Sequence, residues 1–269
     1  MSGSQAGLGV YPNKIGKASG EWKHDKFYIP FMPSISGEKK NLVRLIIEGR
    51  TADVCVALKH LYGVNINFRD EDKVTPLMHA LLKGEHEVVM RLIDSGAHLR
   101  VKDCARRTIL MYAVRGGNME NVTLLAERGI NNFTDKDDDE VTTLMYASWG
   151  GNYEIVKHIF SKPSVHINAI NKHGETALMY SMLAKYRGSV SETSAVALID
   201  NNADVNIAAS NGQTALMCAA RFGGPHMLVA AGRLIEAGAN RYAINEDGRT
   251  AEYFAKSNGH HSIARLLSK

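Results

Sequence analysis

The feature that most constrains this chain is a tetrad, Thr-x-Leu-Met, that recurs at nearly equal spacing. Its copies begin at Thr75, Thr108, Thr142, Thr176 and Thr214, and a degenerate sixth begins at Thr250. Successive threonines are 33, 34, 34, 38 and 36 residues apart. A period of this length is typical of repeat architectures, in which every copy forms one supersecondary unit. The chain is therefore expected to fold as a row of similar units rather than around one central core.

Each copy predicts a pair of helices. The threonine is a good N-cap, and Pro76 stands at the first helical position, where its missing N–H costs nothing. Glycines such as Gly84 end this short helix after about two turns, and Asn118 or Asn152 can cap the next one. The segment Glu87–Asp94 then shows the apolar period of a second, amphipathic helix. Such a pair cannot bury both of its apolar faces alone, so the copies must stack.

These residues resemble the ankyrin repeats, whose pattern Asp-x-x-Gly-x-Thr-Pro-Leu-His-x-Ala-Ala-x-x-Gly-His recurs about every 33 residues. The Thr-Ala-Leu-Met-Tyr form at 176–180 looks like a variant from expanded protist ankyrin families. The resemblance covers residues 38–269 and implies an all-α solenoid of about seven helix-turn-helix units with β-hairpin fingers. We expect the units to start near residues 39, 75, 108, 142, 176, 214 and 250. The first lacks the tetrad and has the length of a capping copy.

Two departures from the family pattern carry physical expectations. Met replaces the family His in five tetrads, so a ladder of flexible thioethers should fill the space of the imidazoles. The family's turn glycine is present in the last three hairpins but replaced by Lys73, Arg106 and Glu140 in earlier ones. If those turns keep a left-handed residue, each replacement costs about 1 kcal/mol. We expect the earlier fingers to differ in shape from the later ones.

The resemblance also implies that partners contact the inner face of the first helices and the hairpin tips. In each copy the residue after the tetrad Met and the residue three further on share one helical face. Aromatic and arginine side chains there have the composition favoured at binding hot spots. The predicted partner-binding residues are His79, Tyr112, Arg115, Tyr146, Trp149, Tyr180, Arg221 and Phe254. The alternative is that these side chains pack between neighbouring first helices.

A run of charge lies in one predicted hairpin. Residues 135–140 hold five acids and one Lys, which is typical of a solvated loop. The alternatives are a docking tip for a basic partner or a weak cation site, although the run lacks the spacing and glycine of a calcium loop. Arg106 and Arg107 on the preceding hairpin could offset part of this charge in an exposed and therefore weak pairing.

Residues 1–37 differ from the repeats. Pro30 and Pro33 prevent a continuous helix through the apolar stretch 27–33, so an extended arm is expected. Its candidate anchors are Trp22, Phe27, Tyr28 and Phe31. Two interpretations stay open: the stretch from Phe27 covers the open end of the first unit, or the arm docks on another protein.

Composition and motifs exclude several functions. The chain has no Gly-x-Gly-x-x-Gly, no phosphate-binding loop and no Gly-x-Ser-x-Gly, so no enzyme, cofactor or small-molecule substrate is expected. A formal charge of +4 over 269 residues is too small to argue for nucleic acid. Three cysteines, widely spaced, fit neither a disulfide framework nor a metal site and favour a reducing, cytoplasmic location. No apolar window is long enough to span a membrane.

These observations favour a non-catalytic protein-binding scaffold. Rigidly stacked units would present the predicted stripe and the hairpin tips with little loss of entropy on binding. One alternative is a cytoskeletal, microtubule-associated component docked through its arm. Another is a regulatory subunit that occludes an enzyme or a nucleic-acid-binding factor. The identity of the partner is not encoded in the scaffold residues, because function lies in the variable positions.

Overall fold

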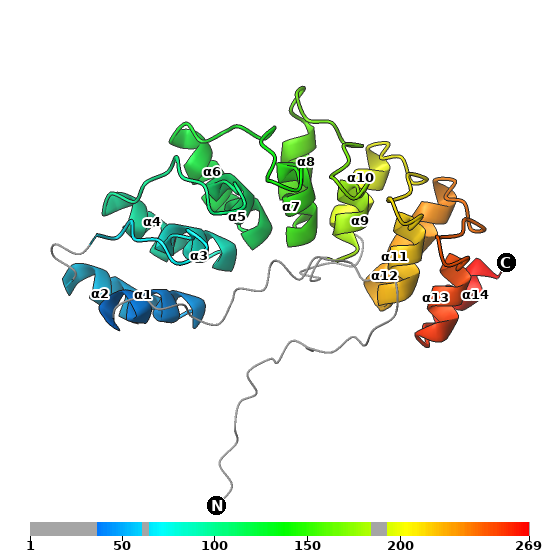
Figure 1. Ribbon diagram of the computed structural model, residues 1–269, viewed down its shortest axis with the longest axis horizontal. Coiled ribbons are helices and arrows are strands. Elements are labelled where there is room, and N and C mark those ends of the chain that lie inside the picture. The colour runs from blue at the N-terminus through cyan, green and yellow to red at the C-terminus, as the bar shows by residue number, and fades with distance from the viewer. Residues whose placement is uncertain (1–36, 61–64, 184–192, 269) are drawn as a thin grey trace, which may run out of the picture. The chain divides into compact units, whose positions relative to one another are not determined.

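The computed structural model describes residues 37–60, 65–183 and 193–268, so the predicted arm lies outside these ranges except for Gly37, which begins the first helix. All described residues belong to one compact unit, Met32–Lys269. Within the described ranges fourteen helices form seven consecutive pairs, which we call units 1 to 7 (Figure 1). The pairs are α1 (Gly37–Ile47) and α2 (Thr51–His60), α3 (Pro76–Lys83) and α4 (His86–Asp94), α5 (Ile109–Gly116) and α6 (Met119–Glu127), α7 (Thr143–Gly150) and α8 (Tyr153–Phe160), α9 (Ala177–Ser181) and α10 (Ser194–Asp200), α11 (Ala215–Phe222) and α12 (Pro225–Glu236), and α13 (Ala251–Ser257) and α14 (His261–Leu267). The expected number of units is confirmed.

The first helix of units 2 to 7 begins at its repeated threonine, as predicted. In every case the threonine backbone is extended and its hydroxyl accepts the N–H group three residues further on. The donor–acceptor distances lie between 3.2 and 3.4 Å. Thr193 caps α10 in the same way. We call the first helix of each unit its inner helix. The tetrad recurs because each inner helix needs this acceptor for its first, otherwise unsatisfied N–H groups.

The thioether ladder is also confirmed. The tetrad methionines of units 2 to 6 are buried, each at 1% exposure or less. In two units the sulfur closes a reciprocal cap, because Met111 Sδ accepts Thr108 N–H at 3.4 Å and Met145 Sδ accepts Thr142 N–H at 3.3 Å. Methionine therefore fills the interior and also replaces part of the polar role that a capping-box side chain usually performs.

The units stack through their first helices. Helix α3 packs against α5, α5 against α7, α7 against α9, and α11 against α13 (Figure 1). Close approach requires glycine at the end of two of these helices: a Cβ on Gly116 would lie 1.9 Å from the Leu81 carbonyl oxygen, and one on Gly150 would lie 2.6 Å from that of Val114. These glycines therefore let adjacent inner helices make backbone-level contact.

The fingers, the hairpins that lie just before each capping threonine, all contain a left-handed residue. The φ angles of Lys73, Arg106 and Glu140 are 61°, 62° and 61°, and those of the glycines at 174, 212 and 248 lie between 70° and 75°. Our expectation that the earlier fingers differ in shape is wrong at this turn. The reason is a shared hydrogen bond in which the left-handed residue donates its N–H to the carbonyl three residues earlier, as in Glu140 to Asp137 and Gly174 to Asn171.

Successive fingers are joined by one backbone hydrogen bond at each junction. Cys104 N–H donates to Asp72 O, and Asp138 N–H donates to Ala105 O, at 2.8 and 3.0 Å. The same bond recurs from Lys172 to Asp139, Ser210 to His173 and Glu246 to Asn211, at 2.8 to 3.0 Å. The fingers of units 2 to 7 therefore form a continuous series in which every finger position depends on its neighbour.

The left-handed lysine leads to a test. Replacing Lys73 by glycine should raise the free energy of unfolding by about 1 kcal/mol, because glycine adopts positive φ without the Cβ clash. Urea unfolding of the full chain measures the change. The matched control is Gly174→Ala, which should lower the free energy of unfolding. The alanine would have to adopt a φ of 73°, and its Cβ would lie 2.9 Å from Ser210 N. A Lys73→Gly variant that unfolds at lower urea than the wild type would contradict the argument.

Candidate functional site

A polar tether connects each of three fingers to the first helix of its own unit. The Tyr112 hydroxyl donates to Asp103 Oδ2 at 2.7 Å, and the Tyr146 hydroxyl donates to Asp137 Oδ2 at 2.6 Å. In unit 5 the direction reverses, and Asn171 Nδ2 donates to Tyr180 Oη at 3.2 Å. Finger residue and tyrosine are separated by nine residues in all three units. The tether holds the finger against the inner helix.

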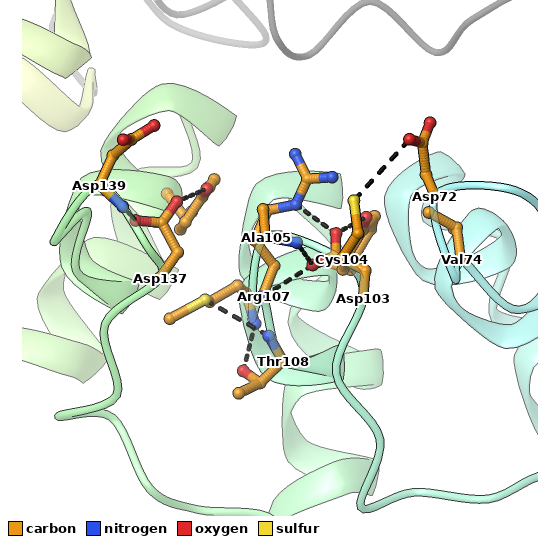
Figure 2. Close-up of polar contacts among 12 residues, drawn as sticks. Asp72, Val74, Asp103, Cys104, Ala105, Arg107, Thr108, Asp137 and Asp139 are labelled. Atoms are coloured by element: carbon orange, nitrogen blue, oxygen red, sulfur yellow. Dashed lines mark hydrogen bonds and ion pairs between the residues drawn. The ribbon is translucent and has the colours of Figure 1, made fainter.

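The same finger residue organises its own hairpin. Asp103 Oδ1 accepts the N–H groups of Ala105 and Arg107 at 3.0 and 2.8 Å (Figure 2). Asp137 Oδ1 accepts those of Asp139 and Val141 at 2.9 and 2.8 Å. One oxygen of each carboxylate therefore closes the turn and the other reaches the helix, so a single side chain sets both the shape of the finger and its angle to the unit.

Arg107 adds a buried charge to the tether of unit 3. Its guanidinium pairs with Asp103 Oδ2 (Figure 2) and lies 5.7 Å from the centre of the Tyr112 ring. Burial acts to lower the pKa of Arg107, but Tyr112 and Asp103 outweigh it and raise the pKa above the ordinary value. Burial and the adjacent Asp103 raise the pKa of Tyr112. Arg107 therefore stays charged and Tyr112 stays a neutral donor.

The other units show what the tether requires. In unit 2 His79 takes the tyrosine position, with Nε2 3.4 Å from Asp70 Oδ2. In unit 6 the finger residue is Ala209 and its counterpart is Cys218, and in unit 7 Phe254 follows a finger asparagine by nine residues. Sequence analysis missed this pairing. The signal was available, because a hydroxyl or imidazole stands at the helix position in every unit whose finger has an acid and in unit 5.

The structure separates the predicted partner-binding residues into two groups. Those directly after the tetrad Met, or at that position in the last unit, are buried, with Tyr146 and Tyr180 at 1% exposure. This interior group is His79, Tyr112, Tyr146, Tyr180 and Phe254. Their placement matches the alternative in which the side chains pack between neighbouring first helices. The surface available to a partner is therefore smaller than the eight predicted residues imply, because the fingers fold back over these five positions.

The second group is half-exposed and forms what we call the contact row. It consists of the predicted residues Arg115, Trp149 and Arg221 and of two leucines at the same position in their units, seven residues after the capping threonine, Leu82 and Leu183. Each of units 2 to 6 contributes one residue. At its centre the guanidinium carbon of Arg115 lies 3.6 Å from the centre of the Trp149 ring, and Trp149 meets Tyr180 edge to face at 5.9 Å. Burial lowers the pKa of Arg115 to about 10, so the cation remains charged at neutral pH. Arg115 and Trp149, both among the predicted residues, thus meet here between neighbouring units.

The acidic finger of unit 4 is largely neutralised by neighbouring bases. Lys102 pairs with Asp135 at 3.5 Å, Lys136 with Glu140 at 3.4 Å, and Arg106 with Asp138 at 3.7 Å. The expected contribution from Arg106 is confirmed, and its exposed pair is worth little. Arg107, the other expected base, pairs instead within its own finger. Among the residues that the structure describes, no group of three or more His, Cys, Asp or Glu side chains could hold a metal ion.

Two further observations bear on the class of function. Burial raises the pKa of all three cysteines, which are free thiols, so none has the depressed pKa of a reactive thiolate. No helix in the described ranges is long and apolar enough to cross a membrane. The candidate arm anchors Trp22, Phe27, Tyr28 and Phe31 lie outside the described residues.

Comparison with known proteins agrees with this architecture. A family model of ankyrin repeats (3 copies) matches residues 42–137 and 182–269, and a model of ankyrin repeats (many copies) matches residues 130–180. This chain belongs to the ankyrin-repeat family. The crystal structure of the human ASB11 ankyrin repeat domain is similar over 85% of this chain and 97% of that one, with a TM-score of 0.61 and 22% identity. That likeness concerns the fold.

One sequence relative is much longer than this ankyrin-repeat chain. Protein glp-1 of Caenorhabditis elegans is 24% identical over 219 residues, which are 78% of this chain and 16% of that protein. The similarity is therefore to a small part of that relative. Ankyrin repeats generally act as non-catalytic protein-interaction modules, and at this level the family supports a binding scaffold.

The tether of unit 4 leads to a pH test. Burial raises the pKa of the Asp137 carboxyl above its ordinary value of 3.8, despite opposing hydrogen bonds from Tyr146 and backbone N–H groups. The folded state therefore holds the proton where the unfolded state has released it, so stability falls as pH rises through the raised pKa. Asn in place of Asp137 removes this loss and can donate to the phenol as Asn171 does.

We expect the stability of Asp137→Asn relative to wild type to increase with pH from about 3.8 upward and to level off above the raised pKa. Urea unfolding of both proteins across this range measures the difference. Asp138→Asn, at an exposed position of the same finger, is the charge-matched control. If the stability difference between Asp137→Asn and wild type stays constant or decreases with pH, the pKa of Asp137 is not raised in the folded state.

Proposed function

We propose that this ankyrin-repeat chain is a non-catalytic scaffold that binds a partner protein on its contact row. The observation that carries the proposal is the Arg115–Trp149 stack at the centre of a half-exposed row with a leucine on either side of it along the units. Arginine and tryptophan are the residues most enriched at binding hot spots, and such anchors lie in largely desolvated surroundings. The lowered pKa of Arg115 reflects such desolvation.

Rigid display supports the same proposal. Trp149 contacts both Arg115 and Tyr180, so little side-chain freedom remains to be lost on binding. Tyr180 is itself tethered to Asn171, which links this surface to the finger of unit 5. The row is thus fixed before a partner arrives.

The two finer alternatives differ in the part of the chain that they require. A cytoskeletal component docked by its arm needs residues 1–37, whereas a regulatory subunit that occludes its target needs the repeats. Deleting residues 1–37 and comparing the detergent-insoluble fraction of the source cell separates them. Loss of the protein from that fraction favours the cytoskeletal alternative, and capture of the same partner with and without the arm favours a target bound by the repeats, as the regulatory alternative requires.

The contact row is tested by paired substitution. Arg115→Ala with Trp149→Ala should reduce cross-linked partner recovered from the source cell by about ten-fold, because the cation and the large aromatic surface are both lost. Arg115→Met is the milder variant, because it keeps the alkyl stem and removes the charge. Arg91→Met on the exposed face of α4 makes the same charge change elsewhere.

Quantitative cross-linking with mass spectrometry reads out partner recovery, and the thermal midpoint reads out folding. We expect the thermal midpoints of Arg115→Met and Arg91→Met to be equal, and partner recovery to fall in Arg115→Met alone. Equal recovery from both single variants would contradict the proposal. A collapse of the midpoint in Arg115→Met would show that the stack belongs to the core.

A further inference from the structure

The inner helix of unit 7 exposes positions that are buried in units 2 to 6. In those units the second, third and sixth residues after the capping threonine are each at 2% exposure or less. The sixth residue faces the next unit, because a Cβ on Gly116 of unit 3 would lie 1.9 Å from the carbonyl oxygen of Leu81 in unit 2. In unit 7 the three positions hold Glu252, Tyr253 and Lys256, which we call the end face.

The end face is open to solvent. Tyr253 is 48% exposed, and the side chains of Glu252 and Lys256 are 35% and 66% exposed. Within the described ranges no helix follows α14, so no further inner helix covers α13. The end face is therefore the packing surface that each preceding inner helix uses, continued to a position where the described chain offers no occupant.

Tyr253 stands in the place of the tetrad methionines and is held in position. The guanidinium carbon of Arg249 lies 5.3 Å from the centre of its ring, and Phe254 meets it edge to face at 5.8 Å. A polar end face would be enough to terminate a stack of repeats, and it needs no large aromatic side chain. A half-exposed tyrosine with little freedom to lose is instead typical of a binding anchor.

The charges of the end face are complementary to themselves. Glu252 and Lys256 lie four residues apart on one side of α13 and pair with each other at 2.8 Å. The pair is exposed, so little free energy is lost when its members exchange partners. A twofold axis midway between them, with a second α13 antiparallel to the first, brings each Glu252 to the Lys256 of the other copy. An isologous interface requires this kind of self-complementary pattern.

We propose that the end face binds a second copy of this chain. The two α13 helices pack antiparallel, Glu252 of each copy pairs with Lys256 of the other, and the two Tyr253 rings lie close to the axis. The occupant of the end face is then an inner helix, as it is at the junctions within the stack.

This interaction goes beyond partner binding on the contact row. The interface is small, so we expect a weak dimer whose population depends on concentration. A dimer carries two contact rows, so a partner with two binding sites gains avidity without any new contact.

Charge exchange tests the proposal by sedimentation equilibrium of the full chain. Glu252→Lys alone and Lys256→Glu alone should each weaken self-association about ten-fold, because like charges then face each other across the axis. An equimolar mixture of the two variants should regain the wild-type association, because every lysine of one copy meets a glutamate of the other. The difference between the mixture and the single variants should shrink at high salt.

Tyr253→Ser supplies a test that does not depend on charge. It should weaken self-association at any salt concentration, because apolar burial at the axis is lost. The matched control is Tyr153→Ser on α8, where a half-exposed tyrosine lies beside Lys157 at 5.8 Å, and it should dimerise as wild type. Tyr253→Ser decides the question even if a charge variant fails to fold, which the thermal midpoint of each variant shows.

A second control repeats the charge exchange elsewhere. Glu87 and Arg91 form an exposed pair of the same spacing on α4, at 3.6 Å. Glu87→Lys, Arg91→Glu and their mixture should all associate as wild type. The proposal is overturned if the full chain stays monomeric up to about 1 mM, or if the mixture of end-face variants associates no better than each variant alone. Growth beyond a dimer also overturns it, because head-to-tail stacking does not close. Arg115→Met leaves the dimer intact, so the dimer can fail independently of the contact row.

Discussion

The rest of this structure depends on one constraint, that no unit completes its own backbone contacts. Each finger donates one N–H group to the carbonyl of the preceding finger, and the inner helices meet where only glycine fits, at Gly116 and Gly150. Stability therefore resides in the junctions as much as in the units, as expected of a quasi-one-dimensional fold. The capping threonines recur because every unit starts a helix whose first N–H groups need an acceptor, and the methionines recur because every unit has the same interior to fill.

The tethers convert this stack into a rigid display. A finger closed only by its own backbone could pivot about the start of the inner helix, whereas the bond from Tyr146 to Asp137 fixes its angle. The carboxylate that accepts this bond also closes the turn through Val141 N–H. Buried polar networks of this kind stabilise only when every member is bonded. Asn171 meets the requirement as well as the acids do, because its amide can donate to Tyr180.

The sequence predicted the fold well and the site only in part, for physical reasons. Periodicity, caps and glycines are local signals, so helix pairs and their number follow from them. Helical spacing correctly places Tyr146 and Trp149 on one face, but it says nothing of what covers that face. The finger folds back over Tyr146 and leaves Trp149 half-exposed. That distinction depends on contacts nine residues apart between a hairpin and a helix, which no single periodicity describes.

Unit 6 shows how far the scaffold can vary without losing its form. Ala209 and Cys218 replace both partners of the tether, yet the finger keeps its backbone bonds from Ala209 N–H to Gln213 O and from Gly212 N–H to Ala209 O. Gly212 adopts the left-handed turn without strain, so the side-chain tether is dispensable there. Units 3 and 4 lack that glycine and have both the tether and the carboxylate turn. Unit 5 has both a glycine turn, at Gly174, and the Asn171–Tyr180 tether, so the tether is an addition to the backbone bonds and not a condition for the turn. The backbone bonds alone keep the form of the finger, which leaves the contact row free to differ between units.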